Sequence, residues 1–361
     1  MNMDDIIKWL MDMVNYNSTA DTGNTVDCAE YAYHILKDHG INAELIGYTD
    51  GNCMVTAFIK GRSKKRIVLH AHLDTASYGD EAEWRFSPYK ASLKKNCICG
   101  RGTTDCKGQA AVWIRLMCDK AKEAADKNHK EMNYSLMLIL TADEENGGTC
   151  GIKRLIEEHN TAKDAALVIG EGGGFPVPFK NKLLYTIQTE ERTDEISPYN
   201  EAQGAANAEN AEKYSDKDIE RIINKGMEKG YYSELLPEYI KDCGKEKRRL
   251  DVEALYDGME DFFDIAKGSS ANKCVIEVFQ KALRQFIQNA DILPVITPGY
   301  SDNRYLRSLG IPVVGFFPFD ERNGIHMHAA NEYISIKTLE LAYNVMSEAL
   351  DRLIYEDDIN L

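Results

Sequence analysis

Three apolar runs of the sequence, each typical of a buried strand, end in residues that can bind a divalent cation. In open α/β sheets, binding sites form at the carboxyl ends of the strands. We therefore expect these polar residues to meet at one edge of a sheet. The runs are residues 67–73, 135–141 and 165–170, and the polar residues at their ends are His72 and Asp74, Glu144 and Glu145, and Glu171.

A glycine-rich segment and a late histidine extend this set. In GRGTTDCKG, residues 100–108, a single aspartate, Asp105, precedes a predicted helix, and its two carboxylate oxygens can bridge two metal ions. His328 follows the apolar run 311–317. The mixture of imidazole and carboxylate suits zinc, with manganese or cobalt as alternatives. The candidate metal ligands are His72, Asp105, Glu145, Glu171 and His328.

This ligand set predicts two metal ions about 3.5–4 Å apart that share Asp105 and a water molecule. Such ions activate the water and polarise a substrate carbonyl. Glu144, next to the ligand Glu145, is predicted to be the general base that takes a proton from the water and passes it to a leaving amine. Asp74 lies on the same side of its strand as His72 and is predicted to orient the imidazole. The chemistry expected is amide hydrolysis.

Two further histidines leave the ligand assignment open. His70 is two residues before His72, and His326 is two residues before His328, so either could be the ligand in its segment. An isolated His-x-Asp or Glu-Glu pair is also common on protein surfaces. The prediction therefore depends on the coincidence of all these segments.

The elements that must position these residues alternate between helix and strand. This alternation predicts an α/β fold with a mostly parallel sheet flanked by helices. The predicted helices are residues 3–16, 25–39, 108–124, 149–159, 271–289, 302–308 and 336–354, and the further predicted strands are 42–48, 53–60, 292–297 and 311–317.

The segment 182–270 interrupts the alternation. After a candidate strand at 182–191, its sequence is polar and acidic, is punctuated by glycines and predicts several helices. With 361 residues, the chain is about two domains long on a scale of about 150 residues each. We predict a discontinuous catalytic domain, residues 1–181 and 271–361, and an inserted, lid-like subdomain, residues 182–270.

The composition excludes several classes of protein. Acidic residues outnumber basic ones by 58 to 43, and the net charge of −15 would repel nucleic acids and anionic membranes. No apolar run reaches the roughly 18 residues of a membrane span, and the N-terminus is typical of an amphipathic helix rather than a signal peptide. The nine cysteines are scattered, as in a reduced chain. We predict a cytoplasmic protein.

Together these segments resemble the dinuclear zinc amidohydrolase and peptidase family that includes acetylornithine deacetylase, succinyl-diaminopimelate desuccinylase, aminoacylase and glutamate carboxypeptidase. They occur in the order of that family, with roughly its spacing, and cover the predicted catalytic domain. The matching segments are HAHLDT (70–75), GRGTTDCKG (100–108), DEENGG (143–148), GEGG (170–173), GYSDNRYLRSLGIPVVGF (299–316) and HAANE (328–332).

The resemblance implies a role for each matching residue. His72 and Glu171 would bind one metal, Glu145 and His328 the other, and Asp105 would bridge the two. The spacing in the family also favours these two histidines over their neighbours.

The resemblance further implies a cis peptide bond between Asp105 and Cys106. It also implies that Arg304 binds the substrate, because a guanidinium pairs with a carboxylate through two hydrogen bonds.

The insert departs from the family pattern. Family members carry there a lid of two helices on a four-stranded sheet, which in many supplies dimer contacts and a histidine that stabilises the oxyanion. No histidine occurs between His159 and His326. We therefore predict an atypical, largely helical insert, and leave open both a homodimer and the oxyanion donor, for which Arg304, Arg192 and Tyr199 are candidates.

The expected function is that of a metal-dependent hydrolase that cleaves an amide bond of a short peptide or an N-acyl amino acid, as a deacylase, dipeptidase or carboxypeptidase does. Two alternatives stay open. One is a pseudoenzyme that binds metal or peptide without turnover, and the other is an aminopeptidase that selects a free amine. The expected partner is a small molecule or a short peptide, not a nucleic acid or a membrane.

Overall fold

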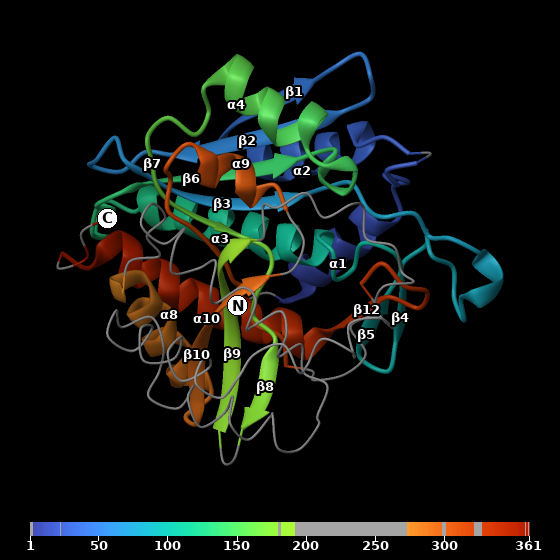
Figure 1. Ribbon diagram of the computed structural model, residues 1–361. Helices are drawn as coiled ribbons and strands as arrows, with labels where there is room; N and C mark the ends of the chain where they lie inside the picture. Colours follow the sequence, from blue (N-terminus) through green and yellow to red (C-terminus); the bar gives the residue numbers. More distant parts are fainter. Residues whose placement is uncertain are drawn as a thin grey trace, which may run out of the picture.

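A single sheet of nine strands forms the centre of the part of the chain that the computed structural model describes: residues 3–21, 23–179, 182–191, 273–297, 301–320, 327–357, 359 and 361. The strand order is β1-β2-β6-β3-β7-β11-β9-β10, and β8 pairs with β9 (Figure 1). The strands are β1 (Asn42–Gly47), β2 (Cys53–Ile59), β3 (Arg66–His72), β6 (Ser135–Thr141), β7 (Ala165–Gly170), β8 (Pro176–Phe179), β9 (Lys182–Glu191), β10 (Ala290–Thr297) and β11 (Val313–Gly315). A second sheet has the order β12-β5-β4 and consists of β4 (Ser92–Lys94), β5 (Cys97–Cys99) and β12 (Tyr333–Ser335).

The middle of the large sheet is parallel. Strands β6, β3, β7 and β11 run in one direction, whereas β1 and β2 join antiparallel at one edge. The two edge strands are antiparallel because a short turn connects them, and only a longer crossover could make them parallel. The predicted fold class, a mostly parallel sheet flanked by helices, is confirmed.

Helices cover both faces of this sheet (Figure 1). Strand β3 separates the two cores, because Ile67 and Leu69 belong to one and Val68 to the other. Side chains alternate along a strand, so His72 lies on the same face as Val68. The face of Ile67 is covered by α1 (Met3–Val14), α2 (Val26–Asp38), α3 (Lys107–Ala125), α8 (Lys273–Phe286) and α10 (Ile336–Tyr355), and the face of Val68 by α4 (Arg154–His159) and α9 (Asn303–Ser308).

Among the helices of the described residues, none combines the length and the apolar character needed to cross a membrane. The cytoplasmic location stays a prediction.

Strand β9 is part of the large sheet. The sequence pattern assigns residues 182–191 to the insert, but β9 is paired with β10 along its length and meets β11 at Gln188. Its side chains Tyr185 and Ile187 are buried in the main core, which is why this strand belongs to the large sheet. Residues 192–270, with their predicted helices, lie outside the described residues, and the domain division remains a prediction.

The side chain of Glu332 fixes the loop that leads into α3. Its carboxylate is buried and accepts hydrogen bonds from Nη1 of Arg101 at 2.8 Å and from the backbone N–H groups of Gly102, Thr104 and Asp105 at 3.0, 2.8 and 3.2 Å. Burial raises the pKa of Glu332, and the guanidinium of Arg101 opposes that shift. These donors compensate a buried charge that would otherwise be costly.

Replacing Glu332 with alanine is expected to lower the free energy of unfolding by about 3–5 kcal/mol, because the charge of Arg101 is then buried without its partner. Equilibrium unfolding in urea measures this change. Glu340→Ala, at an exposed position of α10, is the matched control and should alter the free energy by less than about 0.5 kcal/mol. Equal effects of the two substitutions would show that Glu332 is not the anchor of this loop.

Candidate active site

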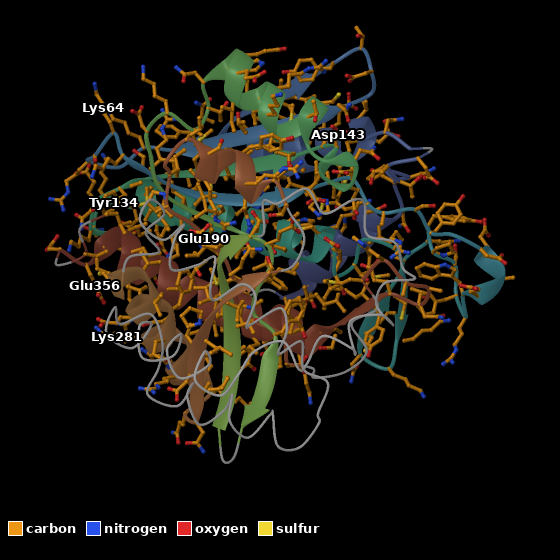
Figure 2. All side chains as sticks on the ribbon, viewed as in Figure 1. Lys64, Tyr134, Asp143, Glu190, Lys281 and Glu356 are labelled. Carbon is orange, nitrogen blue, oxygen red and sulfur yellow. The ribbon has the colours of Figure 1, made fainter. Side chains whose placement is uncertain are left out.

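The candidate site lies where three neighbouring parallel strands end. Strand β3 lies between β6 and β7, and all three run in the same direction. His72 is the last residue of β3, and Glu171 directly follows β7. After β6, Asp143 leads into a 3-10 turn that begins with Glu144 (Figure 2). The strand ends thus bring His72, Glu144 and Glu171 to one edge of the sheet.

Asp105 lies between the two predicted histidine ligands. Its Oδ1 is 3.0 Å from Nε2 of His72, and its Oδ2 is 2.9 Å from Nε2 of His328. The same nitrogen of His72 is 3.3 Å from Oε2 of Glu171, and that of His328 is 3.1 Å from Oε2 of Glu145. One carboxylate therefore joins two groups of potential metal ligands, which we call the His72 group and the His328 group.

The side chain of Asp74 positions Glu145. Its Oδ2 accepts a hydrogen bond from the backbone N–H of Glu145 at 3.0 Å. The Nδ1 of His72 lies 2.9 Å from the backbone carbonyl oxygen of Asp74 and 3.6 Å from Oδ1 of that residue. Nδ1 of His72 thus faces both the carbonyl oxygen and the carboxylate of Asp74, and the role of Asp74 in orienting the imidazole stays a prediction.

Glu144 lies beside both groups. Its Oε2 is 3.9 Å from Nε2 of His72, and its side chain is 12% exposed, so that solvent can reach it. Burial raises the pKa of Glu144 well above its ordinary range, and the carboxylate of Glu171 adds to the shift. The position suits a base next to the metal ligands, and this role stays a prediction.

The site carries more negative charge than its histidines balance. Burial raises the pKa of Glu145. Burial by itself would lower the pKa of His72, but Glu171 and its neighbours raise it well above its ordinary range, and hydrogen bonds to Asp105 and Glu145 raise the pKa of His328 to about 10. Oε1 of Glu171 is buried and accepts no hydrogen bond from the described residues. Two divalent cations fit this arrangement, because they supply positive charge and bind the unused carboxylate oxygen.

His70, the alternative ligand on β3, contacts other partners. Its Nε2 lies 3.1 Å from Oγ1 of Thr141 and 3.3 Å from Oδ2 of Asp302, both buried. In the part of the chain that the structure describes, no group of potential metal ligands includes His70. His326 lies outside the described residues, so the choice of His328 over His326 stays a prediction.

Arg304 lies next to the turn that carries Glu144. Its Nη2 donates hydrogen bonds to the carbonyl oxygen of Gly147 at 2.6 Å and to Oη of Tyr305 at 3.2 Å. Gly147 directly follows the turn Glu144–Asn146, so the guanidinium lies beside the turn that carries Glu144. Its role in substrate binding stays a prediction. The other candidate oxyanion donors, Arg192 and Tyr199, lie outside the described residues.

Two residues that the sequence analysis left without a role also shape the site. Glu332 anchors the loop that carries Asp105. The Gly-Arg-Gly segment of this loop could have indicated such an anchor, because its buried N–H groups need an acceptor. Cys106 is joined to Asp105 by a cis peptide bond, as the resemblance implies. Its Sγ lies in one group with ligand atoms of His72, Asp105 and Glu171.

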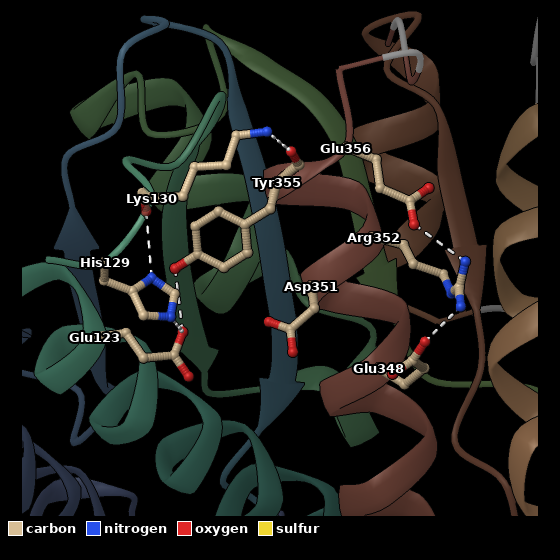
Figure 3. A pocket seen from close by; sticks show the side chains of 8 residues that line it. All are labelled: Glu123, His129, Lys130, Glu348, Asp351, Arg352, Tyr355 and Glu356. Carbon is tan, nitrogen blue, oxygen red and sulfur yellow. Dashed lines mark hydrogen bonds and ion pairs between the residues drawn. The ribbon is translucent and has the colours of Figure 1, made fainter.

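A polar pocket of about 430 Å³ lies elsewhere, between the last turns of α3 and α10 (Figure 3). Side chains that line it form hydrogen bonds with one another: Tyr355 donates to Glu123 at 3.1 Å, and Arg352 donates to Glu356 at 3.1 Å. The described residues that line it include none of the predicted site residues. We therefore place the candidate active site at the strand ends.

The sequence matches a known peptidase family. Residues 68–352 fit the family described as peptidase family M20/M25/M40. Among curated proteins, the succinyl-diaminopimelate desuccinylase of Rickettsia canadensis (strain McKiel) is 30% identical over 155 residues. That match spans 42% of this chain and only 38% of the relative.

Two solved structures share the fold along almost the whole chain. The M20 family metallo-carboxypeptidase Sso-CP2 from Sulfolobus solfataricus has a TM-score of 0.63 at 17% identity, and the match covers 96% of this chain and 98% of that one. The di-peptidase Dug1p from Saccharomyces cerevisiae has a TM-score of 0.61 at 13% identity, with coverages of 96% and 95%. At these identities the likeness concerns the fold alone. Because the family match spans well over half of the sequence, the chain belongs to peptidase family M20/M25/M40.

Proposed function

We propose that this chain is a two-metal hydrolase that cleaves the amide bond of a short peptide or an N-acyl amino acid. The observation that carries the proposal is the position of Asp105, whose two carboxylate oxygens lie 3.0 and 2.9 Å from Nε2 of His72 and of His328. A carboxylate between two groups of ligands is the arrangement that holds a pair of ions. Family membership and the name of the curated relative, a desuccinylase, support amide hydrolysis as the reaction class.

Each group of ligands would hold one cation. His72 and Glu171 form one side, Glu145 and His328 the other, and Asp105 takes part in both. Nitrogen and carboxylate ligands suit zinc, with cobalt or manganese as alternatives. When bound, such ions polarise the scissile carbonyl and activate a water molecule for attack.

Glu144 would move the proton. Its carboxylate takes a proton from the attacking water and delivers it to the nitrogen of the leaving amine. Glu144 is available for this task because its neighbour Glu145 makes the contact with His328. Asp74 and Ala76 hold Glu145 in place, through its N–H and its Oε1, respectively.

Arg304 would select substrates with a free carboxylate. Its Nη2 donates hydrogen bonds to the carbonyl oxygen of Gly147 and to Oη of Tyr305, next to the turn that carries Glu144. A guanidinium beside this turn can pair with a carboxylate on the far side of the scissile bond. This position favours a deacylase, dipeptidase or carboxypeptidase over an aminopeptidase that recognises only the free amine of its substrate.

The protein purified without chelator is expected to contain two equivalents of metal per chain, measured by elemental analysis. Glu171→Gln and His328→Ala each remove a ligand from a different group, so each should lower the content toward one equivalent. Arg304→Ala should leave it unchanged. Absence of metal after incubation with zinc, or unchanged content in both ligand variants, would contradict the proposal.

Glu144→Gln is expected to lower kcat by about 10²–10⁴-fold, because the amide keeps the shape of the side chain but cannot accept the proton. The metal content should stay the same. Glu157→Gln, at an exposed position of α4, is the matched control. If Glu144→Gln keeps most of the activity, another group is the base. If the wild-type protein binds two metal ions but hydrolyses none of a panel of N-acyl amino acids and dipeptides, it is a pseudoenzyme.

Arg304→Ala is expected to lower kcat/KM by about 10- to 100-fold for an N-acetyl dipeptide with a free carboxylate, because a hydrogen bond to a charged group contributes about 1.5–3 kcal/mol. The same dipeptide with a C-terminal amide should lose little. Equal losses on both would show that Arg304 acts on the turn at Gly147 instead. Faster hydrolysis of the free-amine dipeptide than of its N-acetyl form would favour the aminopeptidase alternative.

A further inference from the structure

The start of α9 contacts all three strands that lead into the proposed site. Directly before the helix, Oδ2 of Asp302 accepts a hydrogen bond from Oγ1 of Thr141 at 2.7 Å and lies 3.3 Å from Nε2 of His70. Thr141 is the last residue of β6, and His70 belongs to β3. The first residue of the helix, Asn303, donates from Nδ2 to the backbone carbonyl oxygen of Glu171, directly after β7, at 3.0 Å. One short helix is therefore bound to β3 and to the ends of β6 and β7.

The side chain of Asn303 is fully buried, and its amide is held in one orientation. A backbone carbonyl oxygen can only accept a hydrogen bond, so the NH₂ group must face Glu171. The same Nδ2 donates to Oε1 of Gln188 in β9 at 2.9 Å. Gln188 is fixed in turn, because it donates to Oγ1 of Thr297 at 2.7 Å and accepts from Nη2 of Arg307 at 2.9 Å. The contact between Asn303 and Glu171 thus belongs to a buried network.

The main chain at Glu171 needs such a support. Glycines precede and follow this residue, and Gly172 has a φ of +105°. Glycine leaves the chain more conformational freedom than any other residue, and fixing that freedom costs entropy. The carboxylate of Glu171 points into the site, since its Oε2 lies 3.3 Å from Nε2 of His72. The hydrogen bond from Asn303 therefore holds the piece of main chain from which this carboxylate extends.

We propose that Asn303 is a positioning residue for the cation of the His72 group, which acts by holding the main chain of Glu171. This role rests on the proposed function, since it requires cations in both groups. Groups that orient the ligands of a metal typically contribute about 10- to 100-fold to its affinity. The hydrogen bonds of Asn303 among the described residues do not reach Glu145 or His328. The effect should therefore be confined to one of the two cations.

Asn303→Ala is expected to weaken the binding of one zinc ion by about 10- to 100-fold and to leave the other unchanged. The measurement is dialysis of the metal-loaded protein against buffers of graded free zinc concentration, followed by elemental analysis. If Asn303→Ala does not fold, Asn303→Leu removes the donor but keeps a branched side chain of similar size, and should show the same selective loss. Unchanged affinities, or equal weakening of both zinc ions, would overturn the inference.

The matched control is Leu306→Ala, which truncates another fully buried side chain of α9. Leu306 packs in the core of Val68 and not against Glu171. This variant should lower the melting temperature and leave both zinc affinities unchanged. The same selective loss of zinc in Leu306→Ala would show that the stability of the helix, and not the amide of Asn303, controls the site, and would overturn the inference.

Combination with Glu171→Gln tests whether Asn303 acts through Glu171. Glu171→Gln should already release one zinc ion, so the addition of Asn303→Ala should not weaken the zinc ion that remains. A further loss of affinity of about 10-fold or more for that ion would overturn the inference and leave the proposed function intact. A wild-type protein that binds no zinc would overturn both.

Discussion

The buried carboxylate of Glu332 is the interaction on which the arrangement of the candidate site depends. It collects hydrogen bonds from a side chain and three backbone N–H groups of the loop before α3, the last of them from Asp105. Removing such an acceptor would leave several buried donors unpaired. The loop therefore presents Asp105 in one orientation, with its two oxygens facing different histidines. Because His328 is only four residues before Glu332, one short segment both anchors the loop and contributes a ligand.

Repulsion between like charges is the second constraint. Three parallel strands end side by side, and the carboxylates of Glu144, Glu145 and Glu171 gather there with Asp105. Burial weakens solvation and strengthens this repulsion. The two cations of the proposed function would remove this conflict, so metal binding should stabilise the folded state by mass action.

One scaffold can serve different amide substrates. The relatives compared above are named as a desuccinylase, a carboxypeptidase and a di-peptidase, and function depends on the site that a fold carries. In this chain, Asp105 and the strand ends hold the proposed metal ligands, and Arg304, the proposed substrate-binding residue, lies beside the turn that carries Glu144. These proposed roles all lie close to Asp105.

The sequence by itself determined what depends on local periodicity. The apolar runs 135–141 and 165–170 coincide with β6 and β7, and the parallel order of the strands then brings His72, Glu144 and Glu171 to one edge. Only the tertiary structure decided which atoms meet there. In the structure, Asp74 accepts a hydrogen bond from the backbone N–H of Glu145, and β9 pairs within the main sheet. Glu332 accepts a hydrogen bond from Gly102, 230 positions earlier in the chain. Buried apolar residues recur in the sequence with the period of a helix or strand, so local sequence predicts them. A hydrogen bond between distant segments produces no such repeat in the sequence.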